Sequence, residues 1–412
     1  MICSVSTLCS AQADRSMAKA VLTALTASLL LVLTGCAASQ GPAVPTVAPD
    51  GGQERMALRS AVLQNHARGV AQLWSSSAAQ ARLLLEANQA LVEAPDEQRL
   101  VLARQAWIKA RQAYSPSEVL RFQGGPIDDE DGPEGQINGW PLDEAYIDYV
   151  VDQPMAGLVQ DLKGLPVIDA ASLLQRNEQG GEENIATGWH AVEFLLWGQD
   201  TNSDGPGTRP YTDYLPENPA ALRRGAYLMA VSKLLVDDLA GLAGEWTEAA
   251  PGSFSEGFLA DEERAVRGMW TGLAMLAGHE LAGERIAVAY ETRDQEDEQS
   301  CFSDTTHLDI LANVQGIQQL YRGTIGGQQG PGLRELTAAF DPALAQQLDG
   351  QIEVALKTAG ELTPPFDQAI QAEDGSPQRS QLSQLMSQLE AVAQGAAQAA
   401  QAMQLQINLA GH

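Results

Sequence analysis

The chain has 412 residues, which is long enough for two or more domains of ordinary size, each with its own hydrophobic core. It carries 25 basic and 53 acidic residues, a formal net charge of −28 at pH 7. This balance argues against nucleic acid or an anionic membrane surface as the main ligand, because both reward Lys and Arg. It suits a body that attracts cations.

Residues 1–36 have the pattern of a targeting segment. From Met17, a lysine and a long apolar run lead to the letters LTGC at residues 33–36. Small residues before a cysteine are typical of a bacterial lipobox, so we expect Cys36 to be lipidated and to become the mature N-terminus. Because Ala37 rather than Asp follows it, we expect the outer membrane rather than the inner. The alternative is an ordinary signal peptide with an incidental cysteine.

Residues 37–53 are small, rich in proline and almost uncharged, which predicts a tether between the lipid and the body. The tether has no apolar stretch of about 20 residues, so we expect the lipid alone to hold a monomeric body at the periplasmic face of the membrane. Cys301 is the one cysteine left in that body, and no intrachain disulfide is expected.

Two long helical patterns follow. Residues 56–93 are rich in Ala and Leu, and residues 97–114 carry apolar side chains at helical spacing, namely Leu100, Ala103, Trp107, Ala110 and Tyr114. The letters SPSE at residues 115–118 are typical of a helix start, with a proline at the first position and a capping-box glutamate. Glu118 therefore has a structural explanation as well as a candidate role as a ligand.

Two polar loops rich in Gly and Pro, residues 124–139 and 198–219, interrupt this half of the chain. Long loops in a helical protein are usually functional or disordered, and both lie beside motifs with unusual chemistry, which favours function. After Pro141, the acidic residues Asp143 and Glu144 occupy a first helical turn, where they suit the helix dipole. Asp143 is thus a cap and also a candidate ligand.

Residues 185–197 predict a buried helix, because they are apolar nearly all round. Their two ionisable side chains are His190 and Glu193, and no Lys or Arg lies three or four positions from Glu193 in the same helix. A buried carboxylate is unstable without a partner. The separation of three residues between His190 and Glu193 is used for two ligands of one divalent metal in helical bundles. The alternative is a buried, hydrogen-bonded His–Glu pair.

The second half predicts helices near residues 220–247, 261–291 and 304–322, then Ala/Gln-rich helices to the end. Convincing alternating strands are scarce. The fold class we predict is all-α, with one helical bundle over residues 54–220 and another over residues 221–412. A duplication is a further hypothesis, since both halves hold a Gly-rich helix with His and Glu.

Two further motifs lie in the second half. His279 and Glu280 match the start of the zinc-protease signature HExxH. Gly283 occupies the position of the second His, so the sequence does not match the full signature. In the acidic segment 291–310, we expect Ser303 to cap a helix that carries Asp304 and His307, another acid–His pair three residues apart.

Five stretches together closely resemble the imelysin family, and within it the iron-regulated bacterial lipoproteins: WIKARQAYSPSEVLRFQGGPID, INGWPLDEAYIDYV, GWHAVEFLLWGQD, TGLAMLAGHELAGERI and QEDEQSCFSDTTH. The resemblance implies two helical bundles, with the family pattern GxHxxE, here Gly188, His190 and Glu193, in the groove between them. It also implies a link to iron uptake, or to the peptidase activity for which the family was first named. Gln299 departs from this pattern, because a His often occupies its position.

We therefore expect a periplasm-facing lipoprotein that binds iron or another divalent metal, zinc and manganese being alternatives, or an iron-bearing ligand. The expected partners are the metal ion and an iron-uptake or other membrane protein. The predicted ligands are His190 and Glu193, completed from Glu118, Asp143, Asp304 and His307.

Two other functions stay open. A metallopeptidase needs a metal with an open position and a general base, which one His and one Glu supply incompletely. A non-catalytic binder of a polysaccharide or a protein would use aromatic faces in the groove, with Trp140, Trp189, Trp197, Tyr211 and Tyr214 as candidates.

Overall fold

The structure of the chain is a computed structural model that describes residues 50–247, 251–362 and 364–407. Cys36 and most of the predicted tether lie outside the described residues. The described part of the chain is helical and contains no β-strand, which confirms the predicted all-α fold class. None of its helices is long and apolar enough to cross a membrane.

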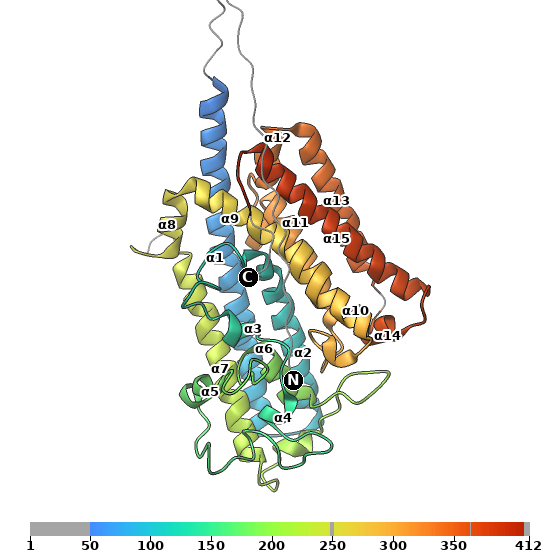
Figure 1. Cartoon of the computed structure of the whole chain (residues 1–412). Coiled ribbons are helices and arrows are strands. Elements are labelled where there is room, and N and C mark those ends of the chain that lie inside the picture. Colours follow the sequence, from blue (N-terminus) through green and yellow to red (C-terminus); the bar gives the residue numbers. More distant parts are fainter. Residues whose placement is uncertain (1–49, 248–250, 363, 408–412) are drawn as a thin grey trace, which may run out of the picture. The chain divides into compact units, whose positions relative to one another are not determined.

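The helix α1 (Asp50–Glu93) begins inside the range predicted as tether and packs along α2 (Glu97–Tyr114) and α7 (Ala221–Glu245) (Figure 1). The apolar positions predicted for α2 are all buried, so its spacing identified the core-facing side. The helix α6 (Gly188–Trp197) is buried along its whole length and packs against α2, α7 and α3 (Glu134–Asn138). The other short elements between α3 and α7 along the chain are α4 (Glu144–Ile147), α5 (Ala170–Arg176) and the 3₁₀ turn η2 (Tyr211–Tyr214).

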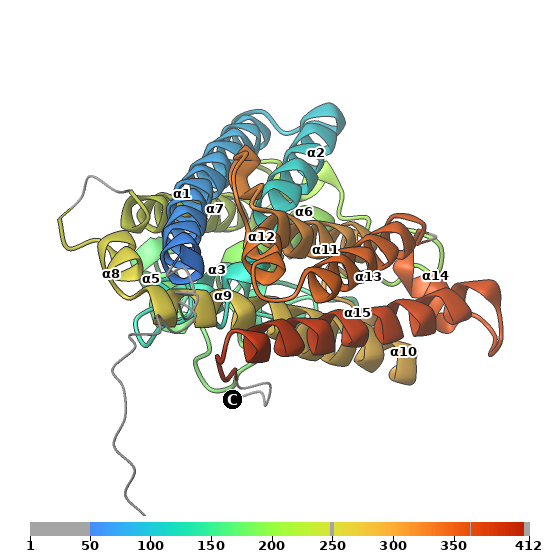
Figure 2. The same ribbon diagram turned by 90° about the horizontal axis from the view of Figure 1, so that it is seen from above.

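In the second half, α9 (Glu262–Met275) continues through η3 (Leu276–Val288) into α10 (Ala289–Thr292). The helix α15 (Pro377–Ala402) lies along α9 and η3 and also contacts α13 (Pro342–Gly360), which packs on α11 (Thr306–Arg322) (Figure 2). The remaining short elements are α8 (Phe254–Ala260), η4 (Gln295–Asp297), η5 (Ile325–Gly327), α12 (Leu333–Ala338) and α14 (Phe366–Gln371).

Several contacts join the two sets of helices. The helix α1 contacts α9 and α12, and α11 packs against α2 and the 3₁₀ turn η1 (Ser115–Leu120). The division into bundles at residues 54–220 and 221–412, and the duplication, stay predictions.

The side-chain cap predicted at Ser115 is wrong, although the 3₁₀ turn η1 does begin there, with Pro116 at its start. Ser115 has helical dihedral angles (φ −54, ψ −29), so α2 runs directly into η1. Its hydroxyl donates to the carbonyl of Arg111 at 2.9 Å and to the carboxylate of Asp309 at 2.8 Å instead of capping. The Ser115 hydroxyl therefore binds Asp309 of α11 rather than capping a helix.

Candidate functional site

Gly188 fixes how α6 enters the core. Its φ of +86° is one that residues with a Cβ rarely adopt, and a Cβ built there would lie 2.4 Å from the carbonyl oxygen of Ile137. The hydroxyl of Thr187, just before it, donates to the carbonyl of Gln136 at 2.8 Å. The close approach of α6 to α3 therefore requires glycine and sets the position of the histidine two residues later.

The first partner of Glu193 is the histidine of its own helix. His190 Nδ1 lies 2.8 Å from Glu193 Oε2, and both side chains are fully buried. The second partner is Ser303, in the segment before α11, whose amide and hydroxyl donate to Glu193 Oε1 at 3.0 and 2.6 Å. The Ser303 hydroxyl also lies 2.7 Å from that of Thr305. No Arg or Lys pairs with Glu193 among the described residues.

The surroundings of this pair favour neutral side chains. Burial raises the pKa of Glu193 to about 8, although the hydrogen bonds from Ser303 oppose the rise. Burial also lowers the pKa of His190 well below its usual range, and the positive charges of Arg111 and Arg285 lower it further. His190 Nε2 is buried and has no hydrogen-bond partner within the described part of the protein. A neutral imidazole with one nitrogen already engaged leaves the other nitrogen available for a ligand.

A network of buried ion pairs lies beside the pair. Arg111 on α2 binds Asp309 on α11, with Nε 2.9 Å from Oδ1. Asp309 also accepts the hydroxyl of Ser300 at 2.5 Å, and Arg111 donates to Asn138 of α3. These bonds join three helices that carry or face the candidate site.

Glu118 belongs to this network and is not a free ligand. Its carboxylate lies 2.6 Å from Arg285 and 3.6 Å from Arg121. Burial alone would raise the pKa of Glu118, but these two guanidinium groups outweigh burial and lower it to about 2. Glu118 therefore stays ionised and holds η1 against η3.

The segment η3 is a π-helix, whose hydrogen bonds join residues five apart. Glu280 and Arg285 are five apart and meet on one side of it, with Arg285 Nη2 3.0 Å from Glu280 Oε2. The same Glu280 oxygen lies 3.2 Å from Arg121. This geometry explains how the segment that failed as a zinc-protease motif supplies an arginine to the buried network.

Two cavities lie on either side of Trp140. One, of about 280 Å³, is polar and is lined by Arg121, Glu134, Asn138, Gly139, Trp140, Pro141, Glu280, Glu284, Arg285 and Gln299. The other, of about 250 Å³, is strongly acidic and is lined by Trp140, Leu142, Asp143, Glu144, Glu183, Glu296, Cys301 and Phe302. Trp140 lines both cavities, and its indole donates to the carbonyl of Glu298 at 3.0 Å.

Asp143 lies in the acidic cavity and also caps α4, where its side chain accepts the amide of Ala145 at 2.9 Å. Next to it, burial raises the pKa of Glu144 to about 7, and the charge of Glu296 adds to the rise. Both roles proposed for Asp143 from the sequence, cap and site residue, are compatible with this position.

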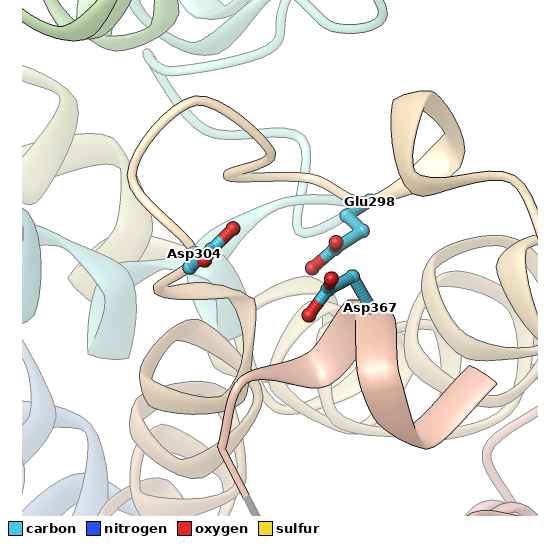
Figure 3. Close-up of side chains that lie close together, drawn as sticks. All are labelled: Glu298, Asp304 and Asp367. Carbon is cyan, nitrogen blue, oxygen red and sulfur yellow. The ribbon is translucent and has the colours of Figure 1, made fainter. Parts of the chain in front are cut away.

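The last two predicted residues lie around the start of α11. Ser303 does not cap this helix, because it binds Glu193, and α11 begins only at Thr306. Asp304 faces Glu298 and Asp367, and the three carboxylates each bring an oxygen within 4.8 Å of the others (Figure 3). His307 is half-buried and burial lowers its pKa, while its Nδ1 has no hydrogen-bond partner in the described part of the chain.

The six predicted ligands therefore do not converge on one point. His190 and Glu193 contact each other, whereas Glu118, Asp143 and Asp304 each have different neighbours. Several residues that shape the site were not predicted from the sequence, namely Arg111, Arg285, Ser300, Asp309 and Asp367. Of the proposed aromatic faces, Trp189, Trp197 and Tyr214 are buried in the core, while Trp140 lines both cavities.

Comparisons with known proteins agree with this architecture. The imelysin family model (Peptidase M75) matches residues 69–399. The chain is similar to iron-regulated protein A of Synechococcus elongatus, with 26% identity over 307 residues that cover 71% of this chain and 72% of that protein. It is also similar to a solved structure from Parabacteroides distasonis, named as a candidate iron-regulated protein A precursor, with a TM-score of 0.65 and 16% identity over 83% of this chain and 95% of that one. At this identity the structural likeness shows the fold alone.

Proposed function

Because this chain belongs to the imelysin family, we propose that it is an iron-related protein that binds Fe(II) or a similar divalent cation through His190. The observation that carries the proposal is the buried Nε2 of His190, which lacks a partner among the described residues while Nδ1 is held by Glu193. The iron-regulated name of the Synechococcus relative supports iron as the cation.

Glu193 lies beside His190 as a carboxylate commonly lies beside a metal-binding histidine. Such a histidine usually donates its other ring N–H to a carboxylate, which fixes the tautomer and orients the ring. With a cation at Nε2, the carboxylate of Glu193 would be ionised and would accept the N–H of Nδ1, while Ser303 holds its other oxygen with two hydrogen bonds. In this proposal Glu193 is a positioning residue rather than a direct ligand, which refines the role expected from its spacing.

The remaining coordination positions need other donors. Within the described residues, no group of three His, Cys, Asp or Glu ligand atoms converges at His190. Water, or the ligand atoms of an iron-bearing molecule, would therefore complete the coordination of the cation. Since His190 and Glu193 are fully buried, entry of a cation requires the segments packed around them to move.

The cellular setting is also a proposal. Lipidation at Cys36 would place the body at the periplasmic face of the outer membrane, as a monomer held by lipid alone, where it would pass its cargo to a membrane protein of iron uptake. The high net negative charge supports the attraction of cations to this body.

The test is a measurement of metal binding with matched histidine variants. Under anaerobic conditions we expect Fe(II), and to a differing degree Mn(II) and Zn(II), to raise the melting temperature, because a ligand that binds only the folded state stabilises it. His190→Ala should lose the rise, whereas the partly exposed control His279→Gln should keep it. An unchanged melting temperature with all three metals, or an equal rise in His190→Ala, would refute the proposal.

A further inference from the structure

A second group of acidic side chains lies apart from His190. Glu298 follows the 3₁₀ turn η4, Asp304 precedes α11, and Asp367 lies in the first turn of α14 (Figure 3). Their exposed fractions are 0%, 7% and 1%, respectively. The segment between η4 and α11 and the distant helix α14 thus bring buried carboxylates close together.

None of these carboxylates is satisfied within the protein. Both oxygens of Glu298, of Asp304 and of Asp367 are buried and lack hydrogen-bond partners among the described residues. Across the described ranges, no Arg, Lys or His forms an ion pair with any of the three. Buried carboxylates are normally paired or bound to a metal, so three neighbouring carboxylates without partners point to a missing positive charge.

Electrostatics agrees with the geometry. Burial raises the pKa of Glu298 well above its usual range, and the charges of Asp367 and Asp304 add to this, although the nearby Thr306 hydroxyl opposes it. Burial, with the charges of Asp200 and Asp367, raises the pKa of Asp304 to about 7. The surroundings therefore disfavour three negative charges unless a cation neutralises them.

We propose that Glu298, Asp304 and Asp367 form a binding site for a hard divalent cation of the size of calcium. An oxygen-only ligand set favours hard cations over Zn(II) or Cu(II), which prefer nitrogen and sulfur donors. One oxygen from each residue lies within 4.8 Å of the others, so a single cation can lie between all three. Ca²⁺ accepts flexible oxygen coordination, whereas Mg²⁺ requires near-ideal octahedral geometry and gives up its water reluctantly.

Asp200 adds negative charge near this site. It is buried, and its charge raises the pKa of Glu298 and of Asp304. Its Oδ1 accepts the amide of Asn202 at 2.9 Å. A bound cation would fix the start of α11 and the segment after η4 to α14.

The cation site goes beyond the iron-binding proposal at His190, and the two fail independently. Protein stripped with a chelator is titrated with Ca²⁺, Mn²⁺ and Mg²⁺ and followed by melting temperature and by isothermal titration calorimetry. We expect Ca²⁺ to raise the melting temperature of the wild type and of His190→Ala. The rise should be lost in Glu298→Gln and in Asp367→Asn, each of which keeps the shape of the side chain and removes one charge.

The matched control is Glu296→Gln, the same change at an exposed position two residues before Glu298, and it should keep the Ca²⁺ response. Without cation, Glu298→Gln and Asp367→Asn should melt above the wild type, because each relieves repulsion among the three carboxylates. If either variant does not fold, calorimetry on the wild type still decides. If the wild type neither binds Ca²⁺ nor gains stability from it, the proposal is overturned, because protons then neutralise the three carboxylates. A Ca²⁺ response that is retained in both variants also overturns it.

Discussion

The buried ion pair of Glu118 with Arg285 makes a measurable prediction about pH. The pKa of Glu118 is about 2 in the folded protein, against an ordinary value of 4.5. A difference of about 2.5 pH units at about 1.36 kcal/mol each means that the ionised carboxylate stabilises the folded state by about 3 kcal/mol. Because the pKa is lowered on folding, this contribution is complete above pH 4.5 and is lost as the pH falls towards 2.

The assay compares the wild type with Glu118→Gln by urea unfolding, followed by circular dichroism from pH 7 to pH 3. At pH 7 we expect the variant to be less stable by about 3–5 kcal/mol, because it leaves Arg285 buried without its main counter-charge. The difference should shrink to roughly half by pH 3, because Glu118 becomes protonated in the unfolded state while it stays ionised in the folded protein.

The control is Glu263→Gln, which breaks an exposed ion pair with Arg267. Exposed pairs are worth about 0–1 kcal/mol, so this variant should differ little from the wild type at any pH. If the effect of Glu118→Gln is large but independent of pH, the charge of Glu118 is not its cause, and the reasoning is refuted.

Three further predictions concern the helix entry, the anchor and catalysis. Gly188→Ala should lower the free energy of unfolding by about 1–3 kcal/mol or more, because the φ of +86° and the nearby carbonyl of Ile137 both oppose a Cβ. Unchanged urea unfolding of this variant would contradict the prediction. Cys36→Ala should release the protein from the membrane into the soluble fraction; a variant that stays on the membrane after a high-salt wash would show that something other than lipid holds it. Metal-loaded protein should leave an unfolded protein substrate intact on a gel, whereas cleavage that stops with a chelator and in Glu193→Gln would establish the peptidase alternative.

Local patterns predicted the helices well where burial follows from spacing. The apolar side of α2 and the nearly all-apolar α6 are both buried as expected. The capping patterns at Ser115 and Ser303 failed for a common reason. The Ser115 hydroxyl donates to Asp309, and the Ser303 hydroxyl donates to Glu193. Both carboxylates lie in segments distant in the sequence, and a local pattern carries no information on such partners.

The site was predictable only in part for the same reason. The contact between His190 and Glu193 follows from a separation of three residues in one helix, so the sequence contains it. The pairing of Glu118 with Arg285 depends on how η1 and η3 pack, and Asp367 lies in a short helix without any recognisable motif. A single sequence gives no means of joining residues so far apart.

The π-helical geometry of η3 makes the length of this segment more important than its composition. Gly283 and Glu284 are exposed, so substitutions there should be tolerated. Deleting one residue from residues 276–288 would allow the segment to return to α-helical hydrogen bonding. Each residue of an α-helix turns the chain by about 100°, so Arg285 would rotate away from Glu118 and the start of α10 would shift with it. Insertions and deletions in this segment should therefore be far more damaging than point changes.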